Sequence, residues 1–296
     1  MRCARFGSSN GLLAIALATG SALPAAADPL SVAGETAIAT NDTSASPQVT
    51  LLPPPGTEHH DGVSLSVGAS YWDGKFGAET TSSIVAVLAN VRYRHGDLRI
   101  DATLPWMHIT SDGTVYQGID GVPLIAAPST SNGVRERDGV GDLSVGASWL
   151  ALHQESAGVD LDVGVRIKLP TSAGSTMLST GKTDETVSID VLRSYGRISP
   201  FVEMGYHVFG NPTGGVLRNG VFGSVGVTML VGTGTFLLLS YDYAERTSRF
   251  IGSANALVAG ASVPVAPRLS VNAYASAGFS SGAPGFSAGT SLKFSL

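Results

Sequence analysis

In several short segments of the sequence, polar and apolar residues alternate. Charged side chains occupy polar positions of these segments, and one histidine occupies another. Acids and bases that face one another across a narrow passage create a transverse electric field, which can filter solutes by charge and dipole. The alternative is that these charges neutralise one another inside a closed, non-conducting interior. The candidates for lining such a constriction are Arg92, Arg94, Arg99, Asp101, Asp160, Asp162, Arg166, Lys168, Asp190, Glu203, His207 and Asp242.

Three other motifs suggest chemistry, and each has a simpler explanation. Gly181-Lys182-Thr183 resembles the end of a phosphate-binding loop, but the glycine required five positions earlier is Thr176, and the alternation that follows excludes the required helix. Glu58-His59-His60-Asp61 has side chains that can bind metal, although a solvated junction explains them better, and we predict no metal and no cofactor. His207 shares a face with Glu203 without a distinctive serine motif, so a lipid hydrolase is the weakest alternative and we predict no enzyme.

The elements that must position these side chains are β-strands, because apolar and polar residues alternate from Gly62 to the end of the chain. Strands of about ten residues are long enough to cross the outer membrane when tilted. About twelve strands are predicted, at residues 63–71, 84–94, 98–106, 143–149, 159–169, 187–191, 202–208, 225–231, 237–243, 257–263, 269–279 and 286–296.

The connections alternate between short turns and longer loops, which is typical of an outer-membrane β-barrel. Because lipid offers no hydrogen bonds, the sheet must close on itself, and its polar faces then point inward. The predicted fold is therefore all-β, a transmembrane antiparallel β-barrel of about 12 strands in the cell outer membrane, in contact with its lipid. The longest loop, residues 110–139, either folds into the lumen or stays on the surface.

A soluble β-sandwich or a water-soluble barrel also alternates, but two features besides the strand length weigh against both. The polar faces contain mostly serine, glycine, threonine and asparagine, with few lysines or glutamates. Aromatic residues gather towards strand ends, as the aromatic girdles of membrane barrels do. These aromatic residues are Tyr71, Tyr93, Trp106, Trp149, Tyr206, Tyr241, Tyr243 and Phe279.

The composition excludes several other classes of protein. Only 14% of residues are charged, compared with about 25% in typical proteins, and the net charge of −5 leaves no basic surface for nucleic acid. Mean hydropathy is positive at +0.21, yet no apolar run of about 20 residues follows the N-terminus, which argues against a helical membrane protein. The single cysteine cannot support a disulfide framework.

The N-terminus has the order of features of a secretory signal peptide. Arg2 and Arg5 precede an apolar stretch at residues 11–22, and Ala25-Ala26-Ala27 supplies small residues for cleavage. We predict a signal peptide at residues 1–27, an extended leader at 28–61 and the barrel at 62–296. The only cysteine, Cys3, is then lost with the signal.

The last segment, Phe286 to Leu296, alternates up to its final residue and resembles the terminal strand by which outer-membrane proteins are recognised. It predicts a partnership with the barrel-assembly machinery. Leu296 stands where the usual strand has a terminal aromatic residue, and Phe294 lies two positions earlier.

Three stretches resemble the outer-membrane transporter family named after the meta-pathway of phenol degradation. They are Gly139-Val140-Gly141-Asp142-Leu143; Lys168-Leu169-Pro170-Thr171 followed by Ser179-Thr180-Gly181-Lys182-Thr183-Asp184; and Tyr93 to Pro105, which ends in Leu-Pro. The resemblance covers most of residues 62–296. It implies a β-barrel for uptake or passage of small compounds, hydrophobic or aromatic ones among them, and it transfers no catalytic residues.

Together these observations predict a porin-like channel or transporter that passes small-molecule solutes through a narrow charged lumen. A non-conducting structural barrel is the main alternative.

Overall fold

The computed structural model describes residues 61–76, 80–127, 133–172, 178–212 and 215–296. The predicted signal peptide and almost all of the predicted leader lie outside these ranges. Within them, no helix has the length and apolar character needed to span a membrane.

The described chain forms one large antiparallel sheet that closes because β2 pairs with both β1 and β3. Twelve strands form the barrel wall, with β6 and β7 together occupying one position beside β3, as the sequence predicts. The wall strands are β1 (Gly62–Gly74), β2 (Ser82–His95), β3 (Leu98–Ser111), β6 (Arg135–Val140), β7 (Leu143–Leu152), β8 (Asp160–Leu169), β9 (Asp184–Leu192), β10 (Ile198–Val208), β11 (Gly220–Val231), β12 (Thr235–Ala244), β13 (Ala254–Ala266), β14 (Leu269–Gly278) and β15 (Phe286–Ser295).

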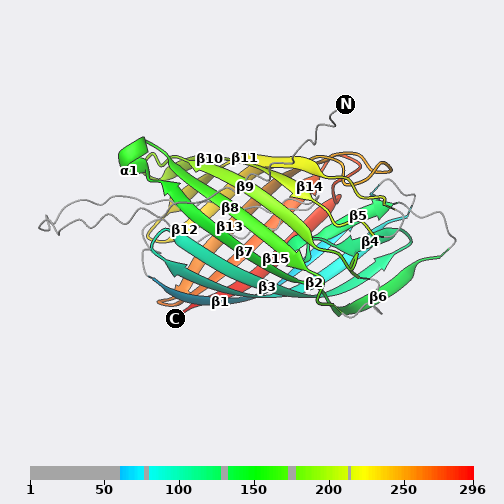
Figure 1. Ribbon diagram of the computed structural model, residues 1–296. Helices are drawn as coiled ribbons and strands as arrows, with labels where there is room; N and C mark the ends of the chain where they lie inside the picture. Colours follow the sequence, from blue (N-terminus) through cyan, green and yellow to red (C-terminus); the bar gives the residue numbers. More distant parts are fainter. Residues whose placement is uncertain (1–60, 77–79, 128–132, 173–177, 213–214) are drawn as a thin grey trace, which may run out of the picture. The chain divides into compact units, whose positions relative to one another are not determined.

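The strands are strongly tilted, and the connections at the two ends of the barrel differ (Figure 1). Short turns lie at the end that holds the C-terminus and the four-residue helix α1 (Gln154–Ala157). Two of these turns use glycine in the left-handed region, Gly96 (φ 55°) and Gly232 (φ 65°), a conformation that costs glycine little and lets the strands reverse tightly. The longer loops lie at the opposite end, as the alternation of connection lengths predicts.

The outer surface of the wall is apolar. Val67 is 57% exposed, Met204 66% and Leu239 54%, and all eight aromatic residues predicted for girdles are also exposed. The polar partners of these residues along each strand turn inward. Closure of the sheet pairs the backbone groups of neighbouring strands, and the apolar belt presents hydrocarbon to lipid.

The segment predicted as a loop over residues 110–139 is mostly ordered structure, which corrects that expectation. β3 continues to Ser111, and β6 pairs with this extension from Ser111↔Arg135 to Trp106↔Val140. The extension was missed because the apolar phase reverses there, with Met107 and Ile109 pointing into the barrel instead of towards lipid.

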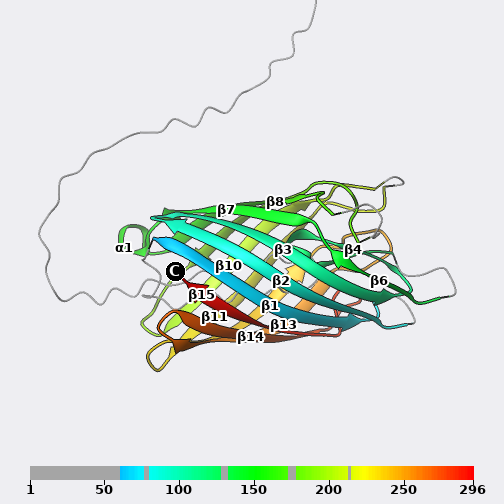
Figure 2. The ribbon, with the colours of Figure 1, turned by 90° about the horizontal axis from the view of Figure 1, so that it is seen from below.

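The middle of the same segment folds into the lumen. It consists of β4 (Thr114–Gln117), the 3₁₀ turn η1 (Ile119–Gly121) and β5 (Pro123–Ala127), with β4 and β5 forming a separate two-stranded sheet. We call Thr114–Ala127 the inner hairpin. The sequence left the position of this loop open, and the structure places its hairpin inside (Figure 2).

Candidate functional site

All twelve sequence-predicted constriction residues point to the inside of the barrel. Ten of them are buried, and Arg94 and Arg166 are partly exposed to the lumen. Their inward orientation follows directly from the strand period of two, since their neighbours along each strand face outward.

The acids and the bases are unevenly distributed around the wall, although β3 carries Asp101 beside Arg99 and β8 carries Arg166 and Lys168 as well as acids. Bases come from β2 (Arg92 and Arg94), β3 (Arg99) and β15, where Lys293 was not among the predicted residues. Acids dominate β8 to β12 and follow the strand register, with Asp162 opposite Asp190 and Asp190 opposite Glu203. Asp242 extends this acidic wall on β12. In the order of strands around the barrel, the centre of the acidic wall lies roughly opposite β1.

Two arginines on the lumen wall are bound by acids. Arg166 forms a double hydrogen bond with Asp101, at 2.7 and 3.1 Å, and its Nη1 also lies 2.9 Å from an oxygen of Asp120. Arg99 pairs with Asp162 at 3.4 Å. Because Asp120 belongs to η1, the Arg166 bridge ties the inner hairpin to β3 and β8.

The tip of the inner hairpin has an unusual backbone. Asp120 has φ 54° and ψ 23°, a left-handed conformation that is uncommon for a residue other than glycine. Its N–H donates to Ser144 Oγ at 2.8 Å, while its carboxylate accepts from Arg166. Gly121 follows with φ 80°, and a Cβ there would clash with Pro105 and Leu88. The tip is thus fitted closely to the wall.

A second polar cluster, which we call the latch, holds the base of β4. Lys168 Nζ lies 2.7 Å from Asp184 and 3.7 Å from Asp142, and it donates to the carbonyl of Gln117 at 3.1 Å. The Gln117 side chain in turn donates to the carbonyl of Asp142 at 2.8 Å and accepts from the Asp142 N–H. These four residues are completely buried. Charges buried to this degree are stable only when paired, so the latch requires all of its members.

The three motifs that carry the family resemblance meet at the latch. Gly141 leaves room for the Gln117 side chain, and its N–H donates to the carbonyl of Pro105 at 2.8 Å. Thr171 Oγ1 accepts from the N–H of Leu143 at 2.8 Å. Ser179 donates to the Asp142 carboxylate. The sequence placed these motifs in turns without a common role, and Asp142 and Asp184 were not among the predicted site residues.

Apolar packing completes the seating of the inner hairpin. Val115 and Ile125 join a cluster on the inner wall that includes Trp72, Ile84 and Met107. Residues on the other side of β5 meet the loops after β10, where Leu124 and Ala126 cluster with Phe209 and Leu217. Thr247 also donates to the carbonyl of Ile125 at 2.8 Å. Apolar side chains therefore pack the inner hairpin against the wall in the long-loop half of the lumen, beside the polar latch.

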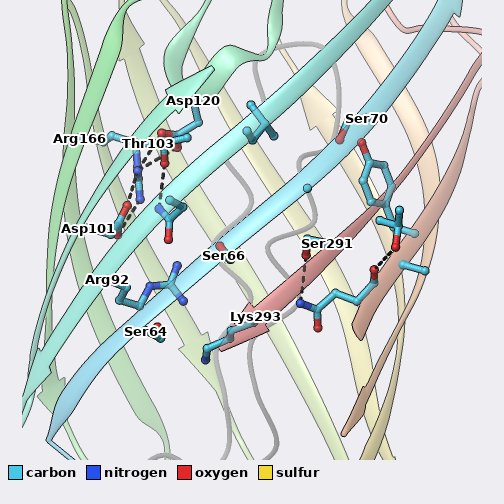
Figure 3. Close-up of a pocket in the computed structure, with 17 residues that line it drawn as sticks. Ser64, Ser66, Ser70, Arg92, Asp101, Thr103, Asp120, Arg166, Ser291 and Lys293 are labelled. Atoms are coloured by element: carbon cyan, nitrogen blue, oxygen red, sulfur yellow. Dashed lines mark hydrogen bonds and ion pairs between the residues drawn. The ribbon is translucent and has the colours of Figure 1, made fainter. Parts of the chain in front are cut away.

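Below the inner hairpin, two voids lie against β1, and a smaller one of about 20 Å³ lies beside Arg99, Asp101 and Arg166. The central cavity, of about 100 Å³, is lined by β1, β2, β3, β14 and β15 and is bounded by Asp101, Arg166 and Asp120 (Figure 3). The mouth cavity, of about 430 Å³, lies at the short-turn end and is lined by Arg94, Arg268 and the C-terminal residues. Three residues line both voids, Ser64, Arg92 and Lys293. The two voids therefore adjoin.

His207 lies within the lumen wall. Its Nδ1 is 2.7 Å from Thr186 Oγ1, its ring stacks on Phe222 with centroids 4.2 Å apart, and it is buried. This position differs from the one that a lipid hydrolase needs, since the outer face and rim meet the lipid.

The Glu58-His59-His60-Asp61 motif, for which we predict no metal, lies mostly outside the described residues. Its last member, Asp61, pairs with His95 at 2.8 Å and accepts the N–H of Gly96 at 2.7 Å. Within the described ranges, no three residues of the types that ligate metals are grouped as ligands.

The structural comparison agrees with this architecture. An outer membrane channel from Pseudomonas putida F1 matches with a TM-score of 0.58 at 12% identity, covering 80% of this chain and 96% of that chain. The translocator domain of the autotransporter NalP from Neisseria meningitidis matches with a TM-score of 0.49 at 11% identity, covering 81% and 91%. The CymD monoaromatic hydrocarbon channel matches with a TM-score of 0.45 at 11% identity, covering 81% and 89%.

No protein-family model matches the sequence, and no curated protein does. At such low identity, the similarity to the Pseudomonas structure establishes the fold alone. The closed antiparallel sheet, with its apolar belt and polar interior, defines the class as a transmembrane β-barrel of the outer membrane. In such barrels the short turns face the periplasm and the long loops face the outside.

Proposed function

We propose that the protein is an outer-membrane channel that passes small molecules, hydrophobic or aromatic ones among them, through a narrow charged lumen. One observation carries this proposal: the mouth cavity and the central cavity share three lining residues, and the central cavity reaches the Arg166 bridge at the inner hairpin. The hairpin shares no ladder with the barrel wall, because β4 and β5 pair only with each other. It can therefore move without breaking the wall.

The apolar cluster around the hairpin supports the choice of hydrophobic or aromatic solutes. Trp72, Ile84 and Met107 line the extracellular half of the lumen, where a solute from outside arrives first. Leu88 packs against this cluster and also lines the central cavity. An apolar surface thus continues from the hairpin to the void. The resemblance to the transporter family of the meta-pathway of phenol degradation points to the same class of compounds.

The sealed structural barrel remains the second candidate, because the closely fitted tip at Gly121 and the paired charges would also suit a permanent plug. Planar-bilayer recording and liposome swelling distinguish the two functions. We expect small single-channel conductance from the purified protein and a larger conductance when residues 114–127 are replaced by a short Gly-Ser linker.

Folding of both proteins is checked by heat-modifiable migration on gels. If both proteins fold and neither conducts or accelerates swelling, the barrel is sealed and the channel proposal fails. If the single-channel conductance of the linker variant equals that of the parent, the inner hairpin is not the barrier to conduction.

The proposed channel also needs export and assembly. We propose that residues 1–27 are the export signal, that residues 28–61 form a leader, and that residues 62–296 form the barrel. β15 is proposed as the strand that the barrel-assembly machinery recognises, since Phe286, Leu292 and Phe294 form an exposed apolar row on it.

A further inference from the structure

We propose that the central and mouth cavities, which share lining residues, form an anion path in which Arg92 and Lys293 hold the carboxylate of a small organic anion. This inference rests on the proposed channel function and names its solute class.

The positions of the two bases follow from the strand register. Arg92 on β2 lies opposite Ser64 of β1, and Lys293 on β15 lies opposite Ser66 of the same strand. The two side chains thus flank β1 from both sides, at nearly the same level. Both project into the lumen and line both voids (Figure 3). A solute that moves between the voids must pass them.

Most of the charged residues that line the two voids are bases. The bases that line the two voids are Arg92, Arg94, Arg166, Arg268 and Lys293. The acids are Asp61, Asp101 and Asp120, together with the terminal carboxylate of Leu296 at the mouth. The path therefore has more positive than negative charge.

The acids beside the path are already engaged. Arg166 binds both oxygens of Asp101 and also binds Asp120. Asp61 pairs with His95, and the Gly96 N–H holds the pKa of the Asp61 carboxyl below its usual value, so it remains ionised at the mouth. Arg92 can be counted against Asp120, the second acid of the Arg166 bridge. The remaining bases are then Arg94, Arg268 and Lys293, and they outnumber the two remaining acids, Asp61 and the Leu296 carboxylate.

The acidic wall lies elsewhere. Asp162, Asp190, Glu203 and Asp242, on β8 to β12, line neither the central nor the mouth cavity. Their side chains do not line the path, whereas those of Arg92 and Lys293 do. Coulomb energy falls with distance and with screening, so the nearest charges dominate selectivity.

The remaining lining of the central cavity indicates the body of the solute. Hydroxyl and amide groups from β1, β2, β3, β14 and β15 offer donors and acceptors, while Leu88 and the ring of Tyr274 provide apolar surface. A cavity of about 100 Å³ holds a single small molecule or several waters. The matching ligand is a small carboxylate with an aromatic or hydroxylated body, and benzoate is a suitable probe.

The test measures ion selectivity and uptake with the full-length protein in lipid. Reversal potentials in a KCl gradient give the chloride-to-potassium permeability ratio. Liposome flux compares benzoate with neutral benzyl alcohol and cationic benzylamine. We expect a ratio above one and preferred flux of benzoate. In Arg92→Gln/Lys293→Gln, the ratio should fall about tenfold, because two charges adjacent to the path are removed.

Two further variants control for charge and folding. Arg92→Lys/Lys293→Arg keeps both charges and should retain the selectivity. Arg193→Gln/Arg197→Gln removes two exposed charges from the β9–β10 turn at the same end of the barrel, outside both voids, and should leave the ratio unchanged. Heat-modifiable migration identifies folded protein in each case.

The permeability ratio tests the anion path, whereas conductance tests the channel function. A folded protein that conducts with a ratio of one or below, or a glutamine variant with the parent's ratio, overturns the anion path and leaves the channel intact. If the parent is silent, the variant with residues 114–127 replaced by a linker is used as the background. Silence of that folded protein overturns the channel function and the anion path with it.

Discussion

Removing the single positive charge of the latch should release the inner hairpin. Lys168 is the only base that pairs with Asp142 and Asp184 in the described cluster, and all three side chains are completely buried. Lys168→Met therefore leaves two buried carboxylates close together without a counter-charge. It also removes the hydrogen bond to the Gln117 carbonyl at the base of β4.

The size of the effect follows from the cost of an uncompensated buried charge. Breaking a buried ion pair by removing one partner costs about 3–5 kcal/mol. If this cost is spent on hairpin opening, the open population rises by about a hundredfold or more, since each tenfold change corresponds to about 1.4 kcal/mol. The wall strands keep their ladders, so the barrel itself should remain folded.

A cysteine reporter can measure this opening directly. The predicted mature chain contains no cysteine, so Ala126→Cys introduces a unique thiol on β5 of the hairpin itself, at a completely buried position. Its maleimide labelling should be slow in the parent and about a hundredfold faster with Lys168→Met. Val134→Cys, at an exposed position beside β6, gives the rate for an accessible thiol.

A second substitution tests whether charge is the cause. Lys168→Met/Asp184→Asn restores the net charge of the latch and should bring labelling of Ala126→Cys back towards the parent rate. Unchanged labelling in folded Lys168→Met would refute the assignment of the latch, and equal acceleration in the single and double variants would refute the electrostatic explanation.

Other consequences of the structure can be checked with single measurements. Gly121→Val should unseat the hairpin tip, because its Cβ meets Pro105 and Leu88, and labelling of Ala126→Cys would then accelerate. Val225→Arg, in the lipid-facing middle of β11, should lower the free energy of unfolding in urea by about 2–4 kcal/mol. Phe294→Ala should reduce the yield of heat-modifiable protein in cells if β15 is the assembly signal. Mass spectrometry of the purified protein should find Asp28 as the first residue, and a chain that begins at Met1 would contradict the signal prediction.

The barrel wall could be predicted from the sequence because lipid imposes a local rule. Each strand must place apolar residues at every second position, as Val163 and Val165 do on β8, and the short turns then separate one strand from the next. Alternation stops identifying the wall strands beyond the part of the wall that faces lipid. Met107 and Ile109 face inward near the long-loop end, so the extension of β3 and its pairing with β6 were read as loop.

The inner hairpin and the latch were beyond prediction because their contacts join residues far apart in the sequence. Gln117 meets Asp142 and Lys168, and Asp120 meets Arg166, across separations that a local pattern cannot specify. The only sequence signal was the presence of turn motifs around Gly141 and Ser179, whose common meeting point becomes visible in three dimensions.

The sequence by itself determined which side chains face the interior, since strand alternation assigns every position to lipid or lumen once the membrane is recognised. It could not determine which of those side chains touch open space. That was decided by the tertiary structure, because the hairpin fills one half of the lumen and leaves the void against β14, β15, β1 and β2. The acids of β8 to β12, equally inward in the sequence, lie away from this void, while Arg92 and Lys293 border it. The face to which a side chain points is set within its own strand. Whether it borders an open path depends on how distant segments fill the lumen.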